Sequence, residues 1–268
     1  MAEVDPAALF AGTAYYYARY RPPYPEAVLA AIATEFGVAE DTRVLDLGTG
    51  TGQVAIPLAA RCREVVATDI SAAMLAEGRQ AAARAGIANI RWLELAAEAV
   101  TPALGRFGLV TIGQAFHWMD RDAVLRRVGP LLESGGGIAL LGMTTIWGAP
   151  EPWAQGVMAV IRRWLGPERR AGAGVHTATS AHNHRPFEEV LADGGFTRVT
   201  TRAWPVVHVW SLDEVVGYLY STSYCSPALF GDRLAAFEAD LRRELLTIEP
   251  AGRFGQAITY SAFLAHRE

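Results

Sequence analysis

Short apolar runs alternate with longer alanine-rich stretches through the middle of the chain, between residues 43 and 141. The apolar runs have the length of buried strands, and the stretches between them have the length of helices. This alternation is typical of an α/β fold with a mostly parallel sheet and helices on both faces. The predicted strands are Arg43–Leu47, Glu64–Asp69, Ile90–Leu95, Gly108–Ile112 and Gly137–Leu141, and the helices lie near Gln53–Ala60, Ser71–Ala85 and Asp122–Val128.

The two flanks of this region have a different pattern. The N-terminal flank predicts two helices, separated by prolines, that would form a helical lid. After the fifth strand, tryptophan-, proline- and glycine-containing sequence with a single helix indicates an inserted cap, and two further strands complete a seven-stranded sheet with an antiparallel strand at its end. These elements are the lid helices Ala7–Tyr20 and Tyr24–Phe36, the cap helix near Trp153–Leu165, helices near Phe187–Asp193, Leu212–Tyr220 and Ala228–Leu246, and strands Thr197–Val207 and Ala257–His266.

One domain can hold all of these elements, because the chain has 268 residues and domains of this size bury a large core. The predicted parts of this single domain are the cover at 1–36, the binding core at 37–143, the cap at 144–186 and the end of the sheet at 187–268.

The most specific motif follows the first predicted strand, where Asp46-Leu47-Gly48-Thr49-Gly50-Thr51-Gly52 places three glycines at alternate positions. Glycine permits tight turns and close approach of a ligand to the backbone, and a helix start offers N–H groups to an anionic group. Asp69 ends the next predicted strand, where an acid can accept hydrogen bonds from ribose hydroxyls. The dinucleotide fingerprint GxGxxG would need glycine at position 53, which holds Gln53.

On these residues the segment resembles motif I of class I S-adenosylmethionine-dependent methyltransferases, and Thr68-Asp69-Ile70-Ser71 resembles their next motif. Tyr-Ala-Arg-Tyr-Arg-Pro-Pro-Tyr-Pro at 17–25 resembles the cover segment of the branch that includes trans-aconitate and ubiquinone-type methyltransferases. Gln-Ala-Phe-His-Trp at 114–118 and the stretch at 131–142 resemble that branch's fourth motif and post-core strand. The resemblance implies a Rossmann-like fold, S-adenosylmethionine as cofactor and methyl transfer to a small molecule, with secondary metabolism as a candidate setting.

The resemblance also implies which residues bind the cofactor. The glycine loop and its preceding acid would lie by the methionine part, the second acid by the ribose, and the residues after it by the adenine. One polar residue would lie beside the sulfonium, and the N-terminal cover would close over the site. The methionine part would meet Asp46, Gly48, Gly50, Gly52 and Gln53, and the ribose would meet Asp69. The adenine would meet Ile70, Met74, Ala97 and Glu98. Gln114 would lie beside the sulfonium, and Tyr17, Tyr20 and Arg21 would form the cover.

The chain departs from the family's pattern just before Glu98. Family members often have Gly-Asp-Ala there, whereas this chain has Leu95-Ala96-Ala97. The adenine edge is therefore left to main-chain groups and to Glu98, whose alternative role is that of a solvated charge on a helix.

His117 is the candidate catalytic residue, because it follows the fourth strand at the carboxyl edge where α/β sheets bind ligands. A neutral imidazole there can take a proton from the acceptor. The alternative is a packed histidine that shapes the pocket beside its aromatic neighbours. Asp120 is expected to cap a helix. We expect no metal site, because the spacing of His176, His182 and His184 is not typical of zinc ligands.

Composition excludes several other functions. All 24 basic residues are arginine, which excludes a pyridoxal phosphate Schiff base and a P-loop lysine. A net charge of -4 without a basic run disfavours a nucleic-acid partner, as does the missing Asn/Asp-Pro-Pro-aromatic motif of nucleic-acid amino methylases. No apolar run approaches the roughly 20 residues of a membrane helix, and the N-terminus does not resemble a signal peptide, so a cytoplasmic location without a membrane partner is expected.

Several alternatives stay open at this point. A small-molecule acceptor is the expected partner, and the sequence leaves a homodimer open. A nicotinamide-dependent oxidoreductase and a non-catalytic S-adenosylmethionine-binding module are the competing functions. The sequence also leaves open whether oxygen, nitrogen or carbon is methylated.

Overall fold

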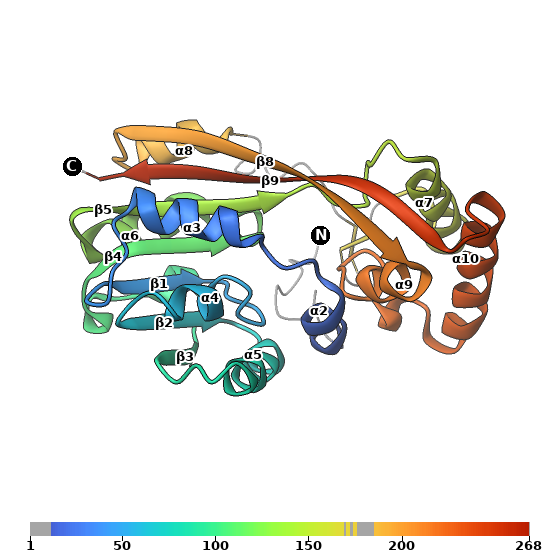
Figure 1. The fold of residues 1–268 in the computed structure, drawn as a ribbon, viewed down its shortest axis with the longest axis horizontal. Coiled ribbons are helices and arrows are strands. Elements are labelled where there is room, and N and C mark those ends of the chain that lie inside the picture. Colours follow the sequence, from blue (N-terminus) through green and yellow to red (C-terminus); the bar gives the residue numbers. More distant parts are fainter. Residues whose placement is uncertain (1–11, 169, 172–173, 176–184, 268) are drawn as a thin grey trace. The chain divides into compact units, whose positions relative to one another are not determined.

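The computed structural model describes residues 12–168, 170–171, 174–175 and 185–267 (Figure 1). Within this part of the chain, the main sheet has seven strands in the order β3-β2-β1-β4-β5-β9-β8. Neighbouring strands among the first five pair in parallel, whereas β5 and β9 pair antiparallel. The predicted α/β class and the seven-stranded sheet are confirmed. The strands are β1 (Arg43–Leu47), β2 (Glu64–Asp69), β3 (Ile90–Glu94), β4 (Phe107–Gly113), β5 (Leu132–Met143), β8 (Arg198–Ser211) and β9 (Arg253–His266).

The helices begin largely where the capping residues of the sequence predict. The Asp120 carboxylate accepts a hydrogen bond from the Ala123 N–H, so the predicted N-cap is confirmed, and the Ser71 hydroxyl caps α5 in the same way by accepting one from the Met74 N–H. In Figure 1, α3 and α4 lie in front of the sheet and α6 lies behind it. The helices are α2 (Ala14–Tyr20), α3 (Glu26–Glu35), α4 (Ala55–Ala59), α5 (Ala72–Arg84), α6 (Arg121–Val128), α7 (Pro152–Leu165), α8 (Phe187–Asp193), α9 (Leu212–Tyr220) and α10 (Leu234–Ile248).

Some boundaries differ from the prediction for local reasons. Helix α2 begins at Ala14, after Gly12 with a left-handed φ of 75°. Helix α10 begins at Leu234, because two short 3₁₀ turns that start at Pro227 and Gly231 precede it. The predicted cap also contains two short antiparallel strands, β6 (Arg170–Ala171) and β7 (Gly174–Val175), that the sequence pattern did not indicate.

The chain forms two compact units, each built from three stretches of sequence. Among the described residues, the sheet unit comprises residues 23–143, 185–204 and 260–267, and the helical unit comprises residues 12–22, 144–168, 170–171, 174–175 and 205–259. Within the helical unit, α7 packs on α10, and the Trp164 indole N–H donates to Asp240. Strands β8 and β9 contribute residues to both units. The four-part division of the sequence stays a prediction.

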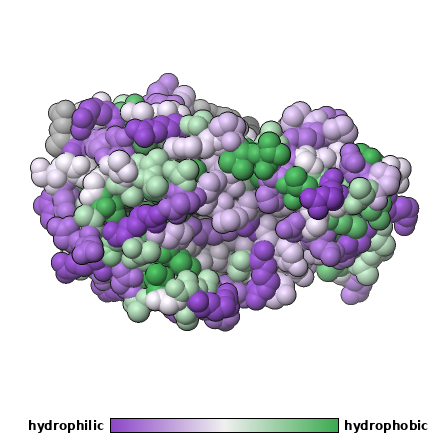
Figure 2. Space-filling model, in the orientation of Figure 1, coloured by the Kyte–Doolittle hydropathy of each residue, from purple (hydrophilic) through white to green (hydrophobic). Residues whose placement is uncertain are grey.

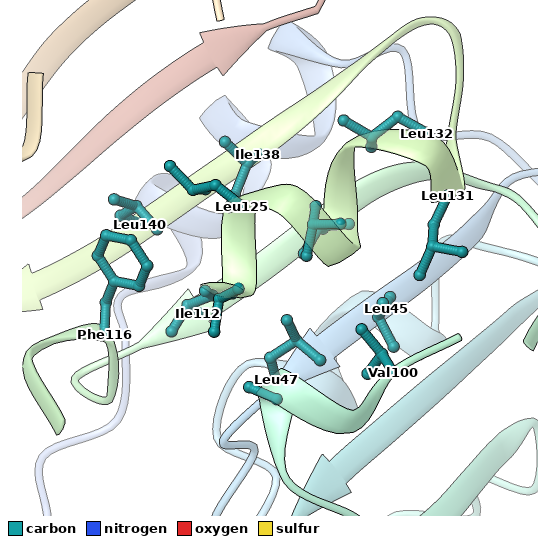
Figure 3. Close-up of a cluster of buried hydrophobic side chains, with 14 of the residues drawn as sticks. Leu45, Leu47, Val100, Ile112, Phe116, Leu125, Leu131, Leu132, Ile138 and Leu140 are labelled. Carbon is teal, nitrogen blue, oxygen red and sulfur yellow. The ribbon is translucent and has the colours of Figure 1, made fainter. Parts of the chain in front are cut away.

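The core of the sheet unit contains aliphatic residues from the central strands and from α6 (Figure 3). Strand β1 lies between β2 and β4, with Asp46 opposite Ala67 on one side and Thr111 on the other. The order of the strands reverses at β1 and β4, and ligands of open α/β sheets bind outside the carboxyl ends of the strands at such a point. The fold therefore directs attention to Leu47 and Gly113, where β1 and β4 end.

On the surface turned toward the viewer in Figure 2, hydrophobic residues are scattered among hydrophilic ones. No helix in the described ranges combines the length and the apolar character that a membrane crossing requires.

Candidate functional site

The glycine loop lies at the carboxyl end of β1 and has a backbone that only glycine adopts readily. Gly48, Gly50 and Gly52 have φ values of 63°, 55° and 82°, in the left-handed region where a side chain is strained. A Cβ on Gly48 would lie 2.6 Å from the Ala115 Cβ, and one on Gly52 would lie 2.7 Å from the Trp92 ring. The loop therefore needs glycine both for its conformation and for its close packing.

Asp69 connects this loop to the start of the next helix. Its carboxylate accepts hydrogen bonds from the Gly50 N–H at 2.8 Å and from the Ser71 N–H at 2.9 Å. The Thr49 N–H donates to the Thr68 carbonyl of the same strand. Burial raises the pKa of Asp69, although the backbone N–H groups of Ser71 and Gly50 oppose the rise. The sequence predicted Asp69 beside the loop, and the structure adds that it fixes the loop's backbone.

Asp46 lies beneath the loop in the middle of the sheet, and its side chain is buried. It accepts hydrogen bonds from the Thr49 hydroxyl at 2.5 Å and from the Thr111 hydroxyl at 2.6 Å. Burial raises the pKa of Asp46 to about 6, the two hydroxyls lower it, and the charge of Asp69 raises it further. The carboxylate therefore links β1, the glycine loop and β4 in one buried network.

The helix after the loop is shorter than the sequence predicted. Gln53 lies in the turn that follows Gly52, and α4 has only five residues, from Ala55 to Ala59. Such a short helix adds little dipole to the site. The left-handed glycine turns of the loop itself, rather than a helix dipole, are therefore the features that suit it to a ligand.

The predicted adenine-facing residues lie before α5 (Ile70), in its first turn (Met74) and in a 3₁₀ turn after β3 (Ala97 and Glu98). Met74 and Ala97 are buried, whereas Ile70 is 38% exposed. Glu98 accepts a hydrogen bond from the Asp120 N–H at 2.9 Å, so its carboxylate supports the start of α6. This contact offers a structural role for Glu98 beside the predicted adenine contact, which stays a prediction.

Gln114 and His117 follow β4 at the same edge of the sheet. Gln114 has a left-handed φ of 54°, the only such value at a non-glycine position among the described residues. Its backbone N–H donates to the Leu141 carbonyl, and its side-chain Nε2 donates to the Met143 carbonyl. His117 lies in a 3₁₀ turn, Phe116–Trp118, with its ring centroid 4.8 Å from that of Trp118. Both residues lie where the motif predicted, and their roles stay predictions.

Tyr17, Tyr20 and Arg21 belong to the helical unit, where they pack against α9. The Arg21 side chain donates to the Ser221 hydroxyl and carbonyl, and its guanidinium lies 4.7 Å from the Tyr17 ring centroid. A Cβ on Gly217 would fall 2.3 Å from the Tyr20 ring. This packing does not bear on whether they contact the cofactor, so that contact stays a prediction. Among the described residues no group of three His, Cys, Asp or Glu could hold a metal, and His176, His182 and His184 lie outside the described residues.

Sequence reasoning missed several residues that shape the site. Thr49 and Thr111 hold Asp46, and Trp92 packs against both Gly52 and Gly78. Tyr24 is buried beside the end of β4. Thr49 stands inside the glycine motif and could have been included, whereas Thr111 became recognisable only through its register opposite Asp46.

Comparison with known proteins finds methyltransferases over the stretch that contains the glycine loop. Residues 44–136 match a family model described as a methyltransferase domain. A tRNA 5-carboxymethoxyuridine methyltransferase from Escherichia coli K12 is 33% identical over 116 residues, which cover 42% of this chain and 44% of that protein. A mitochondrial 2-methoxy-6-polyprenyl-1,4-benzoquinol methylase from Leishmania donovani is 26% identical over 177 residues, covering 58% and 62%. The chain spans about half the length of the curated relatives it matches.

Solved structures extend the likeness to the whole fold. A precorrin-6y C5,15-methyltransferase from Geobacter metallireducens has a TM-score of 0.51 and 16% identity, covering 91% of this chain and 90% of the other. The YcgJ protein from Bacillus subtilis has a TM-score of 0.56 and 16% identity, covering 91% and 99%. At such identities the likeness concerns the fold, and the family match rests on the stretch that contains the glycine loop.

Proposed function

We propose that this chain, which carries a class I S-adenosylmethionine-dependent methyltransferase domain, transfers a methyl group to a small-molecule acceptor. The observation that carries the proposal is the glycine loop at the carboxyl end of β1, in which Gly48, Gly50 and Gly52 have left-handed backbones and the Gly50 N–H donates to Asp69. Glycine at such positions lets a ligand approach the main chain closely, so the loop is suited to binding one.

The residues present fit S-adenosylmethionine. The backbone of residues 48–53, from the first loop glycine to Gln53, would hold the methionine part above Asp46. Asp69 would accept hydrogen bonds from the ribose. Ile70, with its partly exposed side chain, would cover the adenine. The remaining adenine and cover contacts would come from Met74, Ala97, Glu98, Tyr17, Tyr20 and Arg21.

The residues at the end of β4 would then complete the reaction centre. When bound, S-adenosylmethionine supplies a methyl group on a positively charged sulfur, which a nucleophile displaces directly. The chain's own contribution is to hold the acceptor in line and to exclude water, which can account for a large part of a rate enhancement. His117 would take the proton from the acceptor's nucleophilic group where that group carries one. In its alternative role, His117 would form part of the pocket wall.

RNA is a second candidate acceptor, because one relative is named as a tRNA methyltransferase. The net charge of -4 favours a small molecule, since phosphate backbones are recognised by clustered basic residues. We also propose a cytoplasmic location for the protein. A homodimer stays open.

Two measurements test the proposed function. Calorimetry should show binding of S-adenosylmethionine or S-adenosylhomocysteine and no binding of NAD or NADP; the reverse result would contradict the proposal and favour an oxidoreductase. Release of S-adenosylhomocysteine should then be measured with a panel of small acceptors and with unmodified tRNA. Turnover with tRNA alone would replace the small-molecule acceptor, and tight binding without any turnover would indicate a non-catalytic module.

A further inference from the structure

The turn at the end of β4 holds a residue in an unfavourable backbone conformation. Gln114 has a φ of 54°, and glutamine lacks the short side chain that lets asparagine or aspartate stabilise this conformation locally. Strained residues of this kind persist only where the surroundings fix them, and they cluster at ligand sites. Glycine would make the same turn without strain, so the glutamine side chain is expected to serve a function other than forming the turn.

Two hydrogen bonds to β5 hold Gln114 in place. Its backbone N–H donates to the Leu141 carbonyl at 2.9 Å, and its side-chain Nε2 donates to the Met143 carbonyl at 3.0 Å. The second bond settles the orientation of the amide, because a carbonyl oxygen accepts only from the NH₂ end. The Oε1 atom is consequently left as an acceptor, and no donor among the described residues hydrogen-bonds to it.

The neighbours of Gln114 are packed closely on both sides. A Cβ on Gly113 would lie 3.3 Å from the Tyr24 hydroxyl oxygen, and the Ala115 Cβ would lie 2.6 Å from a Cβ on Gly48. The turn is thus confined between a buried tyrosine and the glycine loop. Gln114 lies directly beside the loop that we assign to the cofactor, at the strand ends where the fold binds ligands.

We propose that the Gln114 Oε1 atom accepts a hydrogen bond from the methyl acceptor, which is therefore a molecule with a hydroxyl or N–H group at its nucleophilic centre. This inference rests on the proposed function. A hydrogen bond from the O–H or N–H of the nucleophile to Oε1 would turn the nucleophile's lone pair toward the methyl group, which is the alignment that displacement needs. The proton would pass from this hydrogen bond to His117 or to water as the new bond to the methyl carbon forms. A carboxylate acceptor would instead place two hydrogen-bond acceptors against each other, and a site built for a donor rejects such a group.

The test measures fragment binding to the protein saturated with S-adenosylhomocysteine. Phenol and aniline carry the donor, benzoate carries only acceptors, and toluene is the apolar reference. Ligand-observed NMR should show phenol or aniline binding at least about tenfold more tightly than benzoate and toluene, which is the discrimination of one hydrogen bond. Gln114→Gly relieves the strain and removes the amide, so it should lose about tenfold in phenol affinity and unfold at the same or a higher temperature.

Gln114→Met keeps the length of the side chain without its oxygen, and Gln80→Met makes the same change on the exposed face of α5. The first should lose phenol binding and the second should not. Benzoate binding as tightly as phenol, phenol affinity unchanged in both Gln114 variants, or phenol and aniline binding no better than toluene would each overturn the inference. Loss of S-adenosylhomocysteine binding in Gln114→Gly would assign the amide to the cofactor instead. Failure of the wild-type protein to bind S-adenosylhomocysteine would overturn the proposed function itself, and this inference with it.

Discussion

Replacing Asp46 by asparagine should remove a pH dependence of stability that the buried carboxylate creates. Burial raises the pKa of Asp46 from 3.8 to about 6, so the folded protein binds this proton more tightly than the unfolded chain does. Between these two pKa values the folded state carries more protons, and the free energy of unfolding therefore falls as pH rises. The loss begins near the lower pKa and is complete above the higher one.

The magnitude follows from the size of the pKa change. One pKa unit corresponds to about 1.4 kcal/mol, so the rise from 3.8 to about 6 amounts to about 3 kcal/mol above the higher pKa. Most of this, about 2–3 kcal/mol, should be lost between about pH 4 and pH 7. Asp46→Asn keeps the shape of the side chain. Of the hydroxyls of Thr49 and Thr111, one can keep donating to the amide oxygen and the other can reorient to accept from the NH₂ group.

Urea unfolding of the wild-type protein and Asp46→Asn across this pH range measures the effect, because contributions from other groups cancel in the difference. Between about pH 4 and pH 7, the free energy of unfolding of the wild-type protein should fall by about 2–3 kcal/mol more than that of Asp46→Asn. Asp41→Asn, which removes an exposed carboxylate, is the matched control and should follow the wild-type curve. Parallel curves for wild type and Asp46→Asn would refute the argument, since the carboxylate would then titrate alike in the folded and unfolded states.

Three further predictions concern the site. Asp69→Ala should weaken S-adenosylmethionine binding by about 2–4 kcal/mol in calorimetry, because the ribose contact and the support of the Gly50 N–H are lost together; unchanged affinity in a folded variant would remove Asp69 from the site. Deleting residues 1–21 should leave a folded protein that binds the cofactor much more weakly, and full affinity with full turnover would make that segment merely structural. His117→Ala should lower kcat about 10²–10⁴-fold with little effect on cofactor affinity if the imidazole is the base, whereas near-normal kcat and an unchanged pH profile in His117→Gln would assign it to the pocket wall.

Much of the fold could be predicted because the local signals agree with the global structure. Strands β1 and β2 and helices α8 and α9 have the predicted bounds, since each has clear polar or glycine residues at its ends. Strand β8 extends to Ser211, four residues beyond its predicted end, where Ser211 and Glu214 form a capping box that begins α9. That signal was present in the sequence, and it marks the end of the strand as well as the start of the helix.

The candidate site was predicted in its residues but not in its connections. The motif contains Asp46, yet its bond to Thr111 depends on the register between β1 and β4, which no local pattern specifies. The left-handed turn at Gln114 was equally hidden, because glutamine is not a residue type that signals such a turn. The contact between Glu98 and the Asp120 N–H joins elements that are separate in the sequence, so only the folded chain brings it together.

Trp92 gives the glycine motif a dependence on a distant strand. A Cβ on Gly52 or on Gly78 would come within 2.7 Å of the same indole, so one aromatic ring occupies the volume that both positions leave empty. At Gly78 a larger residue becomes acceptable only after the ring is reduced, whereas Gly52 also needs glycine for its left-handed φ of 82°. Substitutions at positions 78 and 92 should therefore be accepted in a fixed order during divergence, with the change at the tryptophan coming first.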